Sequence, residues 1–307
     1  MATKAVLVIG GSGFLGTHIC QKLRETHKVF ATYYAKPISL DGVSFLPLDL
    51  YDRESVKRLV YKVHPDCIVY AGGNPSFFWA EKNSQMAERL HAGGPSTVAA
   101  VSEVFQSRFI FLSNPYVFDG KRGNYNEQDT VLPGTVLGKA KLTAENFLSS
   151  RSLNYVIIRS SPVFGRGNGY TMPLVDLLRT TSRTVKKIEL SDYKIHSYAP
   201  VQGLTDLVSR AVDGAFRNKI LHYGGLTKMS SYQFAKEFCK RFGLEHGHIA
   251  AQKAKPDEFK RSTGDPTVFD YSVNTSQTIE LLKIKPFLLE EGFDLFEKDL
   301  IGTANLT

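Results

Sequence analysis

The chain has 307 residues, 42% of them hydrophobic and 22% charged, with a formal net charge of +8 at pH 7. These values are typical of an ordinary globular protein of one large domain or two, and they exclude a disordered chain. The basic residues form no long run and do not alternate with aromatics, so we expect no nucleic-acid partner.

No apolar stretch approaches the roughly 20 residues of a membrane helix, and the first residues do not resemble a signal peptide. We therefore expect a cytoplasmic protein with no membrane association. The three cysteines are isolated in apolar contexts and predict neither a disulfide framework nor a metal site.

The first half of the chain alternates short β-rich runs with amphipathic helices. The expected strands cover residues 5–9, 29–33, 67–71, 109–112 and 155–158. Between them, "DRESVKRLVYKV" at residues 52–63 places Val56, Leu59, Val60 and Val63 on one helical stripe. This pattern predicts an α/β fold, a doubly wound parallel sheet of the Rossmann type.

Beyond residue 165 the pattern changes, with helices expected near residues 172–179, through Leu204 to Val212, and over residues 230–243. We expect residues 1–165 to form a dinucleotide-binding Rossmann domain, completed by part of residues 195–225. Residues 166–307 should form mainly a smaller α/β substrate-binding lobe.

A glycine-rich turn, "GGSGFLG" at residues 10–16, follows the first expected strand and opens a helix. Glycines allow a tight turn and a close approach of the backbone to a pyrophosphate, and the helix N-terminus supplies N–H groups to the phosphates. The sequence therefore predicts a dinucleotide site at Gly10, Gly11, Ser12, Gly13, Phe14, Leu15 and Gly16.

The second expected strand ends in "ATYYAKP", where NAD-binding proteins carry an acid and NADP-binding proteins a basic residue. With Tyr33 and Lys36 in place of an acid, we favour NADP over NAD, although Lys36 is equally suited to a solvated surface. Asp49 and Leu50 are expected at the adenine end, where Asp49 has the alternative of capping the next helix. We expect the backbone of Ala71, Gly72 and Gly73 to lie close to the phosphates and the nicotinamide ribose.

Several further segments resemble the extended short-chain dehydrogenase/reductase superfamily, and within it the dTDP-4-dehydrorhamnose reductase group, which includes the regulatory subunit of methionine adenosyltransferase. They are "SNPYVFDG" at 113–120, "GNYNEQD" at 123–129, "LGKAKLTAE" at 137–145, "IIRSSPVFG" at 157–165, "LHYGGLTKMSSYQFAK" at 221–236 and "DYSVNTS" at 270–276. The resemblance implies hydride transfer from NADPH to a 4-keto nucleotide sugar. It also implies cofactor contacts at Ser113, Lys141 and Pro162, and substrate contacts at Phe77, Phe78 and Tyr116. A further substrate contact is expected from His196, because it lies in the polar stretch "LSDYKIHSYAP" at residues 190–200, which should face the pocket.

The chain departs from this family pattern where the family holds the carbonyl oxygen. Leu137 stands in the position of the family's tyrosine, Asn114 in that of its Ser or Thr, and His91 where many relatives carry an asparagine. Lys141, which would lower the pKa of the tyrosine and bind the nicotinamide ribose, is present. Leucine has no proton to give, and loss of general acid catalysis costs on the order of 10²- to 10⁴-fold in rate.

Three interpretations follow. The first is an NAD(P)-binding pseudoenzyme related to nucleotide-sugar reductases, without their tyrosine-dependent reduction. The second is an active nucleotide-sugar oxidoreductase or epimerase with a relocated acid, for which His196 is one candidate. The third is a non-catalytic regulatory subunit, for which either a homodimer or a partner enzyme is compatible with the sequence. In each, the expected ligand is a small molecule, with a nucleotide sugar as the leading class.

Overall fold

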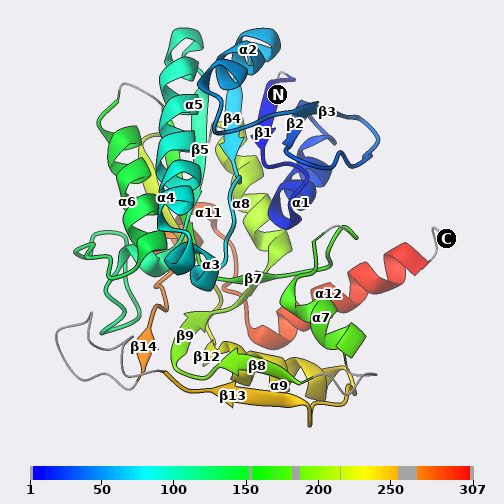
Figure 1. Ribbon diagram of the computed structural model, residues 1–307. Coiled ribbons are helices and arrows are strands. Elements are labelled where there is room, and N and C mark those ends of the chain that lie inside the picture. The colour runs from blue at the N-terminus through cyan, green and yellow to red at the C-terminus, as the bar shows by residue number, and fades with distance from the viewer. Residues whose placement is uncertain are drawn as a thin grey trace. The chain divides into compact units, whose positions relative to one another are not determined.

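The computed structural model describes residues 3–151, 154–169, 171–181, 187–214, 216–254 and 268–304 (Figure 1). The chain divides into two compact units. The first comprises Met1–Val117, Thr135–Arg159 and Thr205–Leu221, and the second Phe118–Gly134, Ser160–Leu204 and His222–Thr307.

A seven-stranded sheet forms the centre of the first unit, in the order β11-β6-β5-β4-β1-β2-β3. Its strands are β1 Ala5–Ile9, β2 Lys28–Tyr33, β3 Val43–Pro47, β4 Cys67–Tyr70, β5 Arg108–Ser113, β6 Tyr155–Ser160 and β11 Lys219–Tyr223. Each neighbouring pair from β3 to β6 is parallel. The doubly wound parallel sheet predicted from the sequence is therefore confirmed. The five expected strands are all present, whereas β3 and β11 were not expected.

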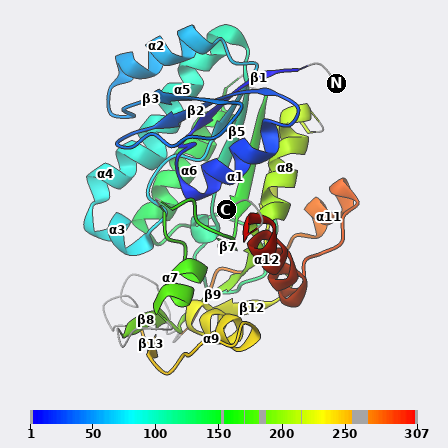
Figure 2. The same cartoon turned by 90° about the vertical axis from the view of Figure 1, so that its right-hand side faces the viewer.

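Helices cover both faces of this sheet. One layer contains α2 (Arg53–Val63), α5 (Gly94–Ser102) and α6 (Val136–Ser149), whose apolar stripes enclose the main core of the unit. All four residues of the predicted α2 stripe are buried. On the opposite face, α1 (Phe14–Leu23) and α8 (Val201–Asp213) are joined by an ion pair of 3.0 Å between Lys22 and Asp206 (Figure 2).

Shorter helical segments complete the first unit. They are α3 Phe77–Lys82, α4 Ser84–Glu88, the π-helical turn η1 Arg89–Gly93, and the 3₁₀ turns η2 Glu103–Phe105 and η3 Pro115–Val117. Among the described residues, no helix combines the length and apolar character that crossing a bilayer requires.

The second unit contains small sheets and four helices among its described residues. The strands are β7 Val163–Phe164, β8 Ile188–Ser191, β9 Lys194–Ser197, β10 Ala199–Pro200, β12 Lys228–Ser230, β13 Ile249–Gln252 and β14 Phe269–Asp270. They form a three-stranded sheet β12-β9-β14 and the two parallel pairs β10-β7 and β13-β8. The helices are α7 Leu174–Thr181, α9 Ser231–Arg241, α11 Ser276–Leu282 and α12 Leu289–Ala304.

Helix α9 shows how local sequence signals build the core of the second unit. Ser230 caps its first turn in a capping box with Gln233, and the chain leaves the helix through Gly243 at a φ of +61°. Phe234 and Phe238 are fully buried and pack against rings of α12. The serine start, glycine stop and aromatic face that the sequence predicts are therefore confirmed.

Candidate functional site

The glycine-rich turn between β1 and α1 is packed so closely that side chains are excluded. Gly10 has a φ of +80°, and a Cβ atom there would lie 2.7 Å from Cα of Gly72. A Cβ atom on Gly16 would lie 2.1 Å from the carbonyl oxygen of Gly10. Both positions therefore require glycine, for backbone conformation or for close packing.

Thr32, at the end of β2, holds this turn in place. Its Oγ1 atom accepts a hydrogen bond of 2.9 Å from the Gly10 N–H, and its carbonyl oxygen accepts one of 3.2 Å from Ser12. Thr32 was not predicted, because the end of β2 is where an acid or a basic residue is expected to distinguish NAD from NADP. A hydroxyl residue at that strand end is the signal that could have revealed it.

The start of α1 is open to an anion. Its N-cap is Gly13, which has no side chain to satisfy the N–H groups of the first turn, and that turn carries no acid. Phe14, Leu15 and Gly16 are the first residues of the helix. The turn and the helix N-terminus together fit the diphosphate of a dinucleotide, because unsatisfied N–H groups and the helix dipole favour negative charge.

The residues expected at the adenine end lie along the carboxyl edge of the sheet. Leu50 lies beside Gly72, because a Cβ atom on Gly72 would be 3.4 Å from the Cδ1 atom of Leu50. Asp49 accepts a hydrogen bond of 2.8 Å from the N–H of Tyr51. The cap of α2 is Asp52, so Asp49 does not have that alternative role. Tyr33 is half-buried at the end of β2, and Lys36 is exposed just beyond it.

A second glycine pair follows β4 and packs against a buried histidine. Gly73 has a φ of +114°, and a Cβ atom there would lie 2.4 Å from Cε1 of His91. His91 lies in the π-helical turn η1, with Nε2 2.9 Å from the carbonyl oxygen of Asn74. Burial, together with the charge of Lys141, lowers the pKa of His91 to about 3. The ring is thus neutral at pH 7, and its Nε2–H donates to Asn74.

Lys141 lies inside the first unit rather than at its surface. Its Nζ atom donates a hydrogen bond of 2.7 Å to the carbonyl oxygen of Leu112 and lies 4.6 Å from the centre of the Phe111 ring. Burial lowers the pKa of Lys141 to about 7, and the nearby carboxylate of Glu145 opposes this shift. The amine is therefore divided between its charged and neutral forms near neutral pH.

Ser113 is engaged in a buried network at the end of β5. Its hydroxyl donates to Glu145, whose carboxylate also binds the guanidinium of Arg159 through Nε and through Nη2 at 2.7 Å. Glu145 and Arg159 are both almost completely buried. The network fixes the end of β5 against α6 and β6, one turn of helix from Lys141.

Leu137, which we expect to stand in the position of the family's tyrosine, is surrounded by apolar side chains. It is 1% exposed and forms a cluster with Ala80 and Ala87, against which Trp79 and Tyr116 pack. The start of α6 is fixed here because Oε1 of Glu81 accepts a hydrogen bond of 2.7 Å from the N–H of Val136. The side chain of Leu137 is therefore part of a small hydrophobic core.

Asn114 and the aromatic residues lie around this cluster. Oδ1 of Asn114 accepts a hydrogen bond of 3.1 Å from the N–H of Tyr116, which leaves its amide N–H₂ group as a donor. Phe77 packs on Tyr116 with ring centres 5.5 Å apart, whereas Phe78 is 47% exposed. Burial raises the pKa of Tyr116, so this phenol is a weaker acid than a free tyrosine.

The two other predicted residues belong to the second unit. Pro162 precedes β7, and its carbonyl oxygen accepts a hydrogen bond from Ala199. His196 lies in β9, buried and stacked on Tyr271 with ring centres 5.8 Å apart. Burial and the charge of Lys194 lower the pKa of His196 to about 3. At pH 7 its imidazole is neutral and carries no proton of suitable acidity for donation.

Comparison with known proteins places these features in a family. The sequence model described as RmlD substrate binding domain matches residues 4–281. The spore coat polysaccharide biosynthesis protein SpsK of Bacillus subtilis is 25% identical over 283 residues, covering 92% of each chain. Methionine adenosyltransferase 2 subunit beta of Rattus norvegicus is 22% identical, over 80% of this chain and 75% of that protein.

The fold has solved counterparts. The crystal structure of dTDP-4-dehydrorhamnose reductase from Bacillus anthracis in complex with NADP superposes with a TM-score of 0.76 at 19% identity, covering 97% of this chain and all of that one. At this identity the likeness demonstrates the fold alone. Because the family model matches most of the chain, this protein belongs to the RmlD substrate binding domain family, within the extended short-chain dehydrogenase/reductases.

Proposed function

We propose that this chain is an NAD(P)-binding member of the nucleotide-sugar reductase family that lacks tyrosine-dependent reduction. Two features of the turn at Gly10–Gly16 support binding of a dinucleotide. Close packing excludes side chains from the turn, and the first turn of α1 has no side-chain cap, so its N–H groups can bind phosphate. A bound nicotinamide dinucleotide would supply hydride chemistry. The exposed Lys36 and the lack of an acid at the end of β2 favour NADP.

The observation that carries the proposal is the burial of Leu137 in an apolar cluster. A ketone that accepts hydride develops an alkoxide, which needs hydrogen-bond donors and a proton. At the two positions where the family places hydroxyl donors, this chain offers only the amide of Asn114. Lys141 is held by the Leu112 carbonyl oxygen and has no tyrosine one turn before it in α6, so the role we assign to it is to anchor the nicotinamide ribose.

A non-catalytic regulatory subunit is the second candidate. It is favoured by the similarity to methionine adenosyltransferase 2 subunit beta over 80% of this chain, in a fold whose proton-donor position is apolar. Co-purification of a stable partner enzyme from the native cell would support this function. A solitary protein with measurable turnover would contradict it. An active enzyme with a relocated acid is less favoured, since His196 is neutral at pH 7.

The test is NADPH oxidation in the presence of a 4-keto nucleotide sugar, such as dTDP-4-dehydrorhamnose. We expect no turnover from the wild type. The double variant Leu137→Tyr with Asn114→Ser should gain at least about 100-fold over the matched control Leu137→Phe with Asn114→Ser, which has the same bulk without the hydroxyl. Turnover by the wild type would contradict the proposal. If none of the three proteins acted, the assigned substrate class would be wrong.

A further inference from the structure

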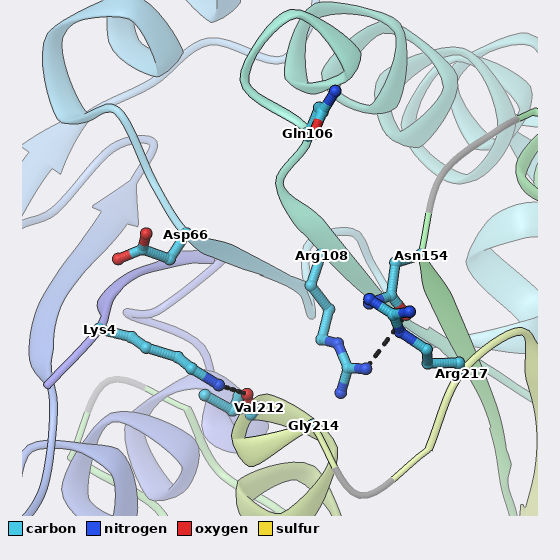
Figure 3. A pocket seen from close by; sticks show the side chains of 8 residues that line it. All are labelled: Lys4, Asp66, Gln106, Arg108, Asn154, Val212, Gly214 and Arg217. Atoms are coloured by element: carbon cyan, nitrogen blue, oxygen red, sulfur yellow. Dashed lines mark hydrogen bonds between the residues drawn. The ribbon is translucent and has the colours of Figure 1, made fainter. Parts of the chain in front are cut away.

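A pocket of about 430 Å³ lies at the edge of the first unit's sheet opposite the glycine-rich turn (Figure 3). Its lining residues come from the segments that enter β1, β4, β5, β6 and β11 at their amino ends. They are Lys4, Asp66, Gln106, Arg108, Asn154, Val212, Gly214 and Arg217. The turn at Gly10–Gly16 follows the carboxyl end of β1, so the pocket is separate from the candidate dinucleotide site.

Two of the cations have a structural role at the end of α8. Nζ of Lys4 donates a hydrogen bond of 2.5 Å to the carbonyl oxygen of Val212, and Arg108 donates to those of Ala211 and Phe216. Such cations satisfy the last carbonyls of a helix and suit the negative end of its dipole. Nη2 of Arg108 also donates a hydrogen bond of 3.1 Å to Oδ1 of Asn154, which Figure 3 shows together with the contact between Lys4 and Val212. These contacts fix the side chains of Lys4 and Arg108 beside the pocket.

The pocket has a third cation, Arg217, in addition to the two that bind the last carbonyl groups of α8. Arg217 is exposed, and within the described part of the chain it forms no hydrogen bond or ion pair through its side chain. Burial lowers the pKa of Arg108, and the charge of Arg217 contributes to that shift, so the two guanidiniums repel each other. Asp66 is the one acid among the described lining residues, and its carboxylate accepts a hydrogen bond of 2.7 Å from the Ala5 N–H.

The lining also indicates what kind of anion would fit. Three cations against one carboxylate leave an excess of positive charge, and arginine matches the geometry of phosphate oxygens. None of the described residues that line the pocket is aromatic, so a nucleobase would find no stacking partner among them. The side-chain amide of Gln106 and the N–H₂ group of Asn154, whose Oδ1 atom already accepts a hydrogen bond from Arg108, are suited to hydroxyl groups.

We propose that this pocket binds a small hydroxylated phosphate monoester, such as a sugar phosphate, through Lys4, Arg108 and Arg217. The monoester places its phosphate between the cations and its hydroxyl groups against the side-chain amides. This pocket is separate from the candidate dinucleotide site, so failure of one proposal would not contradict the other.

The test is calorimetric titration of the full chain with glucose 1-phosphate, inorganic phosphate and glucose, at constant ionic strength set with sodium chloride. Arg217→Glu removes the cation that has no structural contact, so the fold should be retained, and thermal unfolding checks this. Lys240→Ala is the control, because it removes one charge from an exposed position in the second unit.

We expect glucose 1-phosphate to bind to one site, at least about tenfold more weakly in Arg217→Glu and unchanged in Lys240→Ala. Glucose should not bind, and inorganic phosphate should bind more weakly than the ester. Absence of binding, or equal binding by Arg217→Glu, would overturn the proposal, and the latter would point to phosphate held at the glycine-rich turn. Equal affinity for inorganic phosphate would overturn the assignment of a hydroxylated ester.

Discussion

The Nζ atom of Lys141 lies 2.7 Å from the carbonyl oxygen of Leu112, and this lysine has no tyrosine at the position one turn earlier in α6. That position holds Leu137, which is 1% exposed. The lysine is thus positioned by backbone and burial, independently of the residue it accompanies in the family pattern. The proposed role of Lys141 in binding the nicotinamide ribose does not require a neighbouring tyrosine in this arrangement.

Replacing Leu137 with alanine should destabilise the protein by about 2–5 kcal/mol, because a buried leucine contributes transfer free energy and leaves a cavity when truncated. The measurement is urea unfolding. Leu132→Ala is the matched control, since Leu132 is 62% exposed, and its effect should stay within about 0.5 kcal/mol. Equal effects of the two substitutions would show that the Leu137 cluster is not a core.

The burial of Lys141 predicts a pH dependence of stability. Its pKa is about 7 in the folded chain, against its usual 10.5. Between these values the unfolded chain binds more protons, so the free energy of unfolding should rise with pH relative to Lys141→Met, by up to about 1.4 kcal/mol per unit. Below pH 7 the difference should become constant.

Urea unfolding of the wild type and of Lys141→Met measures this difference in the free energy of unfolding. The measurements cover about pH 6.5 to 9.5, on both sides of the pKa of Lys141. Lys139→Met, an exposed position in the same helix, should show no such trend relative to wild type. A difference between wild type and Lys141→Met that does not change with pH would mean that Lys141 stays charged in the folded chain.

Much of the fold could be predicted because it depends on local patterns. The stripe of α2, the capping box of α9 and the buried strands β1, β4 and β5 are each visible within a few residues. Strand β3 escaped prediction because it is a partly exposed edge strand, with no fully buried residue and no clear alternation. Edge strands carry weak sequence signals, since one side has no neighbour.

The sequence indicates candidate residues of the site but not their contacts. The sequence identifies Leu137 as a residue without a proton, yet only the structure shows it packed with Ala80 and Ala87. The partner of Lys141 is a backbone carbonyl 29 residues away, and a backbone group leaves no mark on residue types. His91 against Gly73 is a similar long-range contact.

Lys36 should decide the preference between the two dinucleotides if it meets the 2′-phosphate. We expect Lys36→Ala to weaken NADPH binding about tenfold or more and to leave NADH binding unchanged, because only NADPH carries the additional phosphate. Fluorescence titration with both dinucleotides measures the effect. Lys62→Ala, an exposed lysine of α2, is the control. An unchanged affinity for NADPH would identify Lys36 as a surface residue.

We infer that the turn at Gly10–Gly16 binds a nicotinamide dinucleotide, and isothermal titration calorimetry with NADPH and NADH tests this most directly. We predict binding at one site per chain, weakened at least about tenfold in Gly16→Ala, whose Cβ atom would meet the Gly10 carbonyl oxygen. Gly247→Ala, where a Cβ atom meets nothing within 4 Å, should bind as the wild type does. Folded wild-type protein that binds neither dinucleotide would contradict the claim.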